Sequence, residues 1–291
     1  MNGIERIVVG FDHGETSWSA LKWAIEFAEN EEVPIHVVSV WHHPWWASIP
    51  APFNPVPTPD SGEIQQALEE SLSLALTNHG HPSLPVTTVV LEGEVAGNLN
   101  NEAGPQDLLV VGTRGHGSLG SVLGGSVSAR IVAHTTGPVA VIPLDWEAEE
   151  SDTAVVAVDG SENAAKAAEW AGRHLSYLKA VTVLSAWEVP ALAIPPDPTI
   201  YEQLGDDARM LAEEHTRSAA KSLAVWRSEE SITEVVEHGF AREVVRRWAH
   251  GAQVLVVGAR GHRDLLHGLL GSVTSSVIHR PPCPIIVVPH E

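Results

Sequence analysis

The feature that most constrains this chain is an internal duplication. Two apolar stretches reappear later in almost the same register: 7–12 returns as 155–159, and 109–116 returns as 255–262. The offset is 147 residues for the aspartates that end the first pair and 146 for the second pair, so one deletion accounts for the drift. Because self-similarity over a long period reports a repeated structural unit, the sequence predicts two domains of one fold in tandem.

Length and composition agree with two domains. The 291 residues are enough for two cores of ordinary size, and 44% hydrophobic with 19% charged residues is typical of globular proteins. An acidic stretch at 145–152 separates the apolar end of one repeat from the apolar start of the next. We therefore place the domains at 1–146 and 147–291.

Within each repeat, short β-branched runs alternate with longer segments of helical periodicity. In the first repeat the predicted strands are 4–11, 35–41, 86–91, 107–112 and 138–143, and the predicted helices are 16–29, 62–77, 94–102 and 126–134. Such alternation is typical of βαβ units with right-handed crossovers. The predicted fold class is α/β, with two tandem doubly wound, five-stranded parallel-sheet domains of Rossmann-like type. Ligands of such sheets bind at the carboxyl ends of the strands.

A glycine pattern follows the fourth strand of each repeat. Three glycines and a serine occur at identical spacing in both copies: Gly112, Gly115, Gly125 and Ser126, then Gly258, Gly261, Gly271 and Ser272. Glycines let backbone N–H groups approach an anion, and the helix that begins at the serine attracts negative charge. The loops also carry Arg114 and Arg260 within a very acidic chain. A phosphate-binding loop is the prediction; tight turns without a ligand are the alternative.

The order of these motifs resembles the universal stress protein family, twice over and across nearly the whole chain. The resemblance implies an adenine nucleotide alpha hydrolase-like variant of the Rossmann fold that binds ATP. It places the first-strand aspartate near the ribose and metal, and the end of the second strand against adenine. The implied nucleotide-binding residues are Asp12, Val40, Gly112, Gly115, Gly125, Ser126 and Val127 in one site, and Asp159, Ala186, Gly258, Gly261, Gly271, Ser272 and Val273 in the other.

The two aspartates admit a second interpretation. A carboxylate at a strand end often caps the next helix or fixes a loop, and Asp12 and Asp159 could do this as well as accept from a ribose hydroxyl or hold Mg²⁺ through water. Mg²⁺ is expected with the phosphates. Ala186 stands where the first repeat has Val40, which predicts a looser adenine contact in the second site.

Charge and cysteine content exclude several classes. A formal net charge of −20 repels nucleic acid and anionic membrane surfaces, and the longest apolar runs are too short to cross a bilayer. The first residues lack the basic and apolar stretches of a secretory signal. The single cysteine, Cys283, cannot form an intrachain disulfide, so a reducing cytoplasm is the expected location.

Assembly and some side-chain groups are less specific. The last strand of each repeat, at 138–143 and 284–289, is an apolar edge, so the two are expected to pair with each other or with another chain. The family resemblance implies an internal pseudo-dimer and a homodimer. The histidines of the chain show no zinc-site spacing. Tryptophan- and proline-rich loops follow the second strands, and the sequence does not decide whether they pack over the sheet edge, form a self-association surface or close over the nucleotide as lids.

The leading functional prediction is an ATP-binding regulatory protein of the stress response. The chain has no Gly-Lys-Ser/Thr phosphate motif and no evident base to activate water, so little or no turnover is expected. Alternatives are a slow ATP hydrolase or adenylyl transferase, a nucleotide-free scaffold, or a flavodoxin-like FMN binder. Asp12 and Glu15 in the loop after the first strand argue against FMN.

Overall fold

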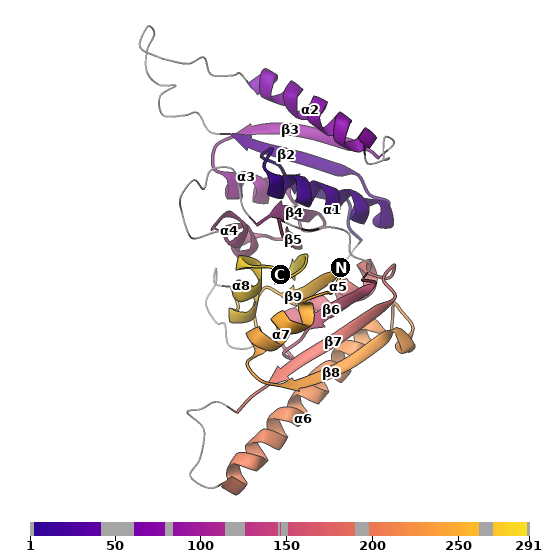
Figure 1. Ribbon diagram of the computed structural model, residues 1–291, viewed down its shortest axis with the longest axis vertical. Helices are drawn as coiled ribbons and strands as arrows, with labels where there is room; N and C mark the ends of the chain where they lie inside the picture. Colours follow the sequence, from indigo (N-terminus) through magenta and orange to yellow (C-terminus); the bar gives the residue numbers. More distant parts are fainter. Residues whose placement is uncertain are drawn as a thin grey trace, which may run out of the picture.

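The chain folds around one continuous sheet. The computed structural model describes residues 3–41, 61–78, 84–113, 126–144, 146, 151–189, 198–261 and 270–289. Ten described strands hydrogen-bond in the order β3-β2-β1-β4-β5-β10-β9-β6-β7-β8, so the repeats lie side by side (Figure 1). The strands are β1 Ile7–Gly10, β2 Ile35–Trp41, β3 Val86–Glu92, β4 Leu108–Gly112, β5 Val139–Ile142, β6 Thr153–Ala157, β7 Ala180–Trp187, β8 Ile232–His238, β9 Val254–Gly258 and β10 Ile285–Val288.

Helices cover both faces of the sheet, as parallel strands require. They are α1 Glu15–Glu31, α2 Ser61–Asn78, α3 Val95–Glu102, α4 Ser126–His134, α5 Glu162–His174, α6 Pro198–Leu223, α7 Ala241–Ala249 and α8 Ser272–His279, with a short 3₁₀ turn η3 at Glu229–Ser231. One apolar core lies under α1, α2, α5 and α6, and the other under α3, α4, α7 and α8. The four inner strands β4, β5, β9 and β10 are buried almost throughout, because both of their faces are covered.

These elements confirm the predicted fold class. Within each repeat all described strand pairs are parallel and follow the order 3-2-1-4-5 of a doubly wound sheet. The segments predicted as 35–41 and 126–134 are β2 and α4 with the same bounds. The predicted first strand is shorter than expected, since β1 spans Ile7–Gly10 only.

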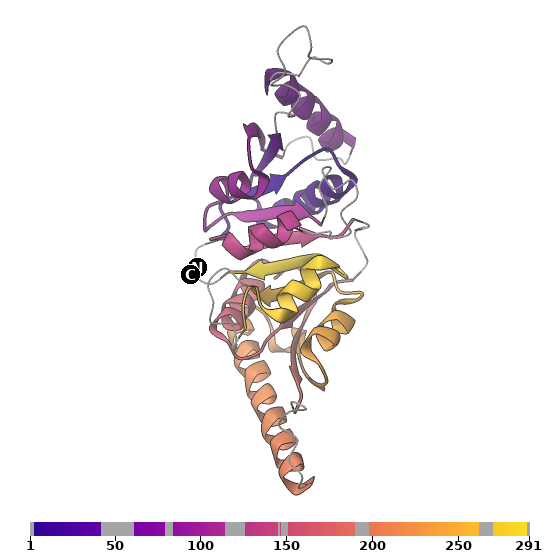
Figure 2. The same ribbon diagram turned by 90° about the vertical axis from the view of Figure 1, so that its left-hand side faces the viewer.

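The two repeats join through their last strands. β10 pairs with β5 in antiparallel register, with Ile286 opposite Ala140, which confirms the predicted internal pairing. Since this pairing is antiparallel, β5 and β10 run in opposite directions at the junction, and the two repeats lie on either side of it (Figure 2). Each of the two predicted apolar edge strands therefore finds its hydrogen-bonding partner within the chain. The homodimer stays a prediction.

A row of aromatic rings crosses the junction between the repeats. Phe27 of α1 stacks on Trp23 at a centroid distance of 4.9 Å and faces Trp170 of α5 at 6.1 Å. Trp170 in turn contacts the ring of His174 at 4.9 Å. His174 is 3% exposed, and its Nδ1 lies 2.7 Å from Oε2 of Glu31 in α1. The halves therefore share a core and a partly buried polar contact.

Candidate functional site

The candidate site of each repeat lies where the sheet order reverses. The chain leaves β1 for β2 on one side, and returns after β3 to place β4 on the other side of β1. The second repeat has β6 between β7 and β9 in the same way. Asp12 and Asp159 follow the central strands, and Gly112 and Gly258 end the neighbouring ones. Such a switch point is the usual ligand position in open α/β sheets.

The strand-end carboxylates fix the turns in which they lie. Oδ1 of Asp12 accepts a hydrogen bond from the backbone N–H of Gly14 at 3.0 Å, and Oδ1 of Asp159 accepts one from Ser161, also at 3.0 Å. These matching Asx turns confirm the loop-fixing interpretation for both residues. Their predicted role toward ribose or Mg²⁺ is compatible with this geometry, because a carboxylate accepts several hydrogen bonds.

The first glycine of each loop lets two backbone segments meet. A Cβ at Gly112 would lie 2.7 Å from the carbonyl oxygen of Thr16 in α1. A Cβ at Gly258 would lie 2.8 Å from both the carbonyl carbon and the Cβ of Asn163 in α5. Real Cβ atoms do not approach backbone so closely, so these glycines bring the loop against the helix that follows the central strand.

The second glycine of the second loop faces the strand-end carboxylate. A side chain at Gly261 would collide with Oδ2 of Asp159. The backbone at Gly261 and the Asp159 carboxylate thus lie directly against each other at the switch point. The equivalent Gly115 lies outside the described residues, as does Gly125.

Backbone hydrogen bonds tie the loop ends to the sheet. The N–H of Gly271 donates to the carbonyl of Ala259 at 3.0 Å, and that of Ala259 donates to Val288 of β10 at 2.8 Å. The hydroxyl of Thr274 donates to the carbonyl of Gly258 at 2.7 Å. Gly271 caps α8 without a side chain, so Ser272 is the first helical residue rather than the cap, and its side chain is exposed. This start of α8 presents backbone N–H groups near the loop.

The predicted adenine-facing positions lie at the ends of the second strands. Val40 pairs with Leu91 near the end of β2, and Ala186 pairs with Glu237 near the end of β7. Both are partly buried against the core that lies under α3, α4, α7 and α8. Val127 and Val273 occupy the second position of α4 and α8; Val127 is 36% exposed and Val273 is partly buried.

Two site residues were missed by sequence reasoning. Asn163 in α5 donates from Nδ2 to the carbonyl of Arg260 at 3.2 Å, while its buried Oδ1 has no hydrogen-bond partner among the described residues. His215 of α6 lies against Gly160, directly beside Asp159. Asn163 stands at the position equivalent to Thr16 in the first repeat. Nothing in the sequence places α6 at this loop.

In the described ranges, no three His, Cys, Asp or Glu side chains gather as a metal-binding group. No helix of those ranges is both long and apolar enough to cross a membrane.

Sequence comparison identifies the family. The universal stress protein family matches residues 3–143 and, a second time, residues 150–289. The chain belongs to the universal stress protein family. The universal stress protein Rv2005c of Mycobacterium tuberculosis is 31% identical over 309 residues, which cover 97% of this chain and 96% of that protein. Universal stress protein MT2052, also from M. tuberculosis, is 29% identical over 97% of this chain and 94% of its own length.

Solved structures of the family share the fold over the full chain. A universal stress protein from Archaeoglobus fulgidus superposes with a TM-score of 0.65 at 18% identity and covers 98% of both chains. A protein from Pseudomonas aeruginosa described as a universal stress protein reaches 0.63 at 17% identity, over 98% of this chain and 93% of its own. The tandem arrangement of two universal stress protein domains is therefore shared, whereas identities this low say nothing of ligands.

Proposed function

We propose that each repeat binds one adenine nucleotide, ATP with Mg²⁺, and that the protein acts as a nucleotide-dependent regulator in stress response. The observation that carries this proposal is the contact of the glycine loop with the strand-end carboxylate at the switch point, through Gly261 and Asp159. A loop that only closed a turn would not need to meet the carboxylate of another turn at the carboxyl edge of the sheet.

The residues present fit the proposed ligand. The backbone of Gly258 and Gly261 and the start of α8 at Ser272 would hold the phosphates, because N–H groups and the helix dipole favour anions. Asp159 would accept from the ribose or hold Mg²⁺ through water. The buried Oδ1 of Asn163 is an acceptor that a donor of the ligand or its water could satisfy. In the first repeat, Asp12, Gly112 and Ser126 take the equivalent places.

Binding rather than turnover is the proposed activity. Bound ATP would place its phosphate charge between the backbone of Gly261 and the start of α8, and a partner protein would read whether the site is filled. We expect ATP turnover well below about 1 per second, the low end of typical enzymes. Faster turnover by the purified chain would favour the hydrolase alternative. We further propose that the protein works in the cytoplasm.

The test combines nucleotide identification with thermal unfolding of the full chain. Mass spectrometry of the nucleotide released from purified protein should find an adenine nucleotide. ATP with Mg²⁺ at about 100 times its Kd should stabilise the binding repeat by about 2.7 kcal/mol. Guanosine triphosphate at the same concentration should give a smaller shift, because the end of β2 reads the adenine ring in this proposal.

Two variants probe the loops separately. Gly261→Glu and Gly115→Glu put bulk and negative charge where the phosphates would approach, and each should remove the ATP-induced stabilisation of its own repeat. Gly3→Glu adds the same charge at a position where a Cβ meets nothing within 4 Å, and should leave the shift unchanged. Loop variants that fold normally and keep the full shift would refute the phosphate-loop proposal.

A further inference from the structure

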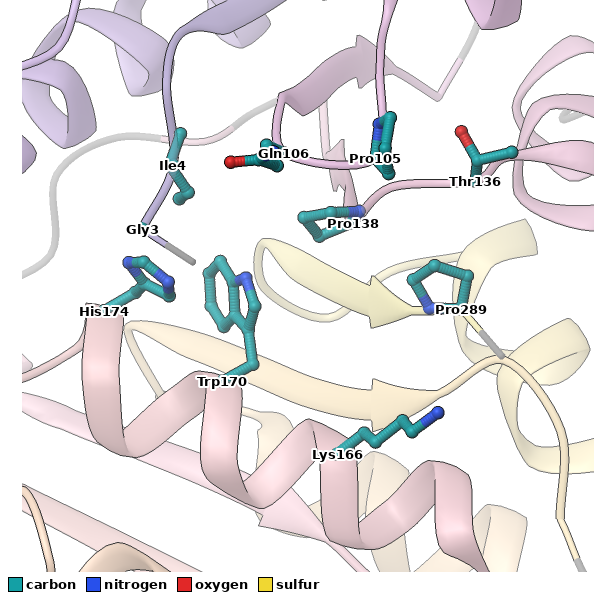
Figure 3. Close-up of a pocket in the computed structure, with 10 residues that line it drawn as sticks. All are labelled: Gly3, Ile4, Pro105, Gln106, Thr136, Pro138, Lys166, Trp170, His174 and Pro289. Atoms are coloured by element: carbon teal, nitrogen blue, oxygen red, sulfur yellow. The ribbon is translucent and has the colours of Figure 1, made fainter. Parts of the chain in front are cut away.

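A cavity opens at the junction of the two repeats, and its Lys166 lies one turn of α5 from Asn163 of the second candidate nucleotide site. It encloses about 290 Å³ and is lined from the first repeat by Ile4, Gln106 and Pro138, at the amino ends of its strands (Figure 3). The second repeat contributes Trp170 and Lys166 of α5. The volume is close to the lower end of the range for small-molecule pockets. An apolar floor with a few polar groups at the edge is the usual composition of such a site.

Because the chain is duplicated, this cavity, called the slot from here on, has a second copy. At the offset of 147 residues, Trp170 corresponds to Trp23 and Lys166 to Ser19, both in α1. The chain itself lies along this part of α1. Ser19 donates to the carbonyl of Leu144 at 2.6 Å, and Lys22 lies over the indole of Trp146 at 5.4 Å from the ring centroid.

The linker therefore fills one copy of the slot with an indole. Trp146 is only 8% exposed and belongs to the core that also contains Trp23 and Phe27. In the other copy the corresponding strand is β10, and the slot beside Pro289 and Trp170 is open among the described residues. A cavity whose pseudo-equivalent holds an indole has the shape and the aromatic wall to accept another flat ring.

We propose that the open slot between the repeats is a binding site for a small planar aromatic carboxylate of about indole size. The ring packs against Trp170 and the prolines that line the slot. The carboxylate pairs with Lys166, whose ammonium group is the one permanent charge among the described lining residues. Lys166 also lies 3.3 Å from Oε1 of Glu162, a largely exposed carboxylate with which a ligand carboxylate would compete.

The binding test uses the full chain and 5-fluoroindole-3-acetate, followed by ¹⁹F NMR. Saturating ATP with Mg²⁺ is present throughout, so that the aromatic probe cannot report binding at an adenine site. The proposal expects one saturable site per chain. Indole-3-acetate should compete better than indole, and tryptamine, which carries a positive charge, should compete worst.

Variants separate the slot from the rest of the surface. Thr136→Trp fills the cavity from its exposed rim and should abolish saturable binding. Lys166→Met should weaken binding of the acetate about fivefold, the size of one exposed ion pair, without weakening that of indole. Glu162→Gln is the matched control: it removes the competing carboxylate and should leave the affinity unchanged or increase it.

The filled copy gives the sharpest result. Trp146→Ala should open the pseudo-equivalent slot and raise the stoichiometry from one to two. Thr136→Trp keeps the proposal testable if Trp146→Ala does not fold. The proposal is overturned if the probe shows no saturable binding, if Thr136→Trp binds as the unaltered chain does, or if binding appears only after residues 290 and 291 are removed, which would make the chain's own end the occupant.

Discussion

The imidazole of His215 occupies the space into which a side chain at residue 160 would project. Gly160 has a left-handed φ of 79° in the turn after β6, directly beside Asp159. In the first repeat the equivalent residue is His13, which adopts a φ of 61° and packs edge-on against Phe11. Each repeat thus places an imidazole at the turn that carries its strand-end aspartate, once from the turn itself and once from α6.

This relationship predicts an unusually costly alanine substitution. Gly160→Ala should lose about 1–2 kcal/mol from the left-handed backbone alone, and more because His215 must move. Gly251→Ala is the matched control, since Gly251 has the same φ of 79° but open space around it. In a His215→Ala background the two substitutions should cost the same in denaturant unfolding. If Gly160→Ala still costs more than Gly251→Ala in that background, His215 does not fill the space beside residue 160.

The end of α1 offers a stabilising substitution. Glu32 caps the helix in the left-handed region at a φ of 55°, and its N–H donates to the carbonyl of Ala28. Glycine adopts this conformation without strain, so Glu32→Gly should stabilise the protein by about 0.5–1 kcal/mol. Glu29→Gly, one turn earlier and exposed, should instead destabilise it by about 1 kcal/mol. A loss of stability in Glu32→Gly would contradict the assigned cap.

The aromatic row predicts where the two repeats depend on each other. Phe27 is 2% exposed and lies between Trp23 and Trp170. Its truncation in Phe27→Ala should cost about 3–5 kcal/mol of unfolding free energy. Phe240→Ala removes a ring that is 54% exposed and should cost less than about 0.5 kcal/mol. Similar midpoints of denaturant unfolding for the two variants would mean that the junction is not a packed core.

Alkaline pH should weaken the protein through Tyr177. Although 39% of this residue is exposed, burial of the phenol raises its pKa above the usual value of about 10, and the charges of Glu31 and Glu26 raise that pKa further. The folded state keeps a proton that the unfolded state releases, so stability falls as the pH rises above about 10.

The tyrosinate titration is simple because the chain has two tyrosines, Tyr177 and Tyr201. In a Tyr201→Phe variant the remaining phenol should ionise above its usual range, at the pH where the fold is lost. Ionisation at the usual pKa of a free phenol, with the fold intact, would refute the assigned environment.

The duplication explains why so much of the fold could be predicted. Each strand and helix signal occurred twice, so the bounds of β2 and α4 could be read from periodicity and motif spacing. The contacts that depend on tertiary placement could not be predicted in this way. His215 of α6 meets Gly160 in the turn between β6 and α5 because of the way this 26-residue helix packs. No local sequence pattern encodes that packing.

The linker shows the same limit. An acidic stretch at 145–152 indicated only a domain boundary, yet Trp146 within it is buried and Leu144 before it accepts a hydrogen bond from Ser19. For the site, the sequence placed Asp159, Gly258 and Gly261 at the carboxyl ends of neighbouring strands, where the structure has them; their binding of nucleotide stays a prediction. It missed Asn163, because an asparagine in the first turn of a helix has no distinctive spacing.

The number of nucleotides bound per chain tests the central claim most directly. Calorimetric titration of the full chain with ATP and Mg²⁺, after removal of any retained nucleotide, should give a stoichiometry of two, falling to one in Gly261→Glu. A stoichiometry of one in the unaltered chain would show that the second repeat is disabled at Ala186 or elsewhere. No binding at all would contradict the account and leave the glycines of both loops as packing residues only.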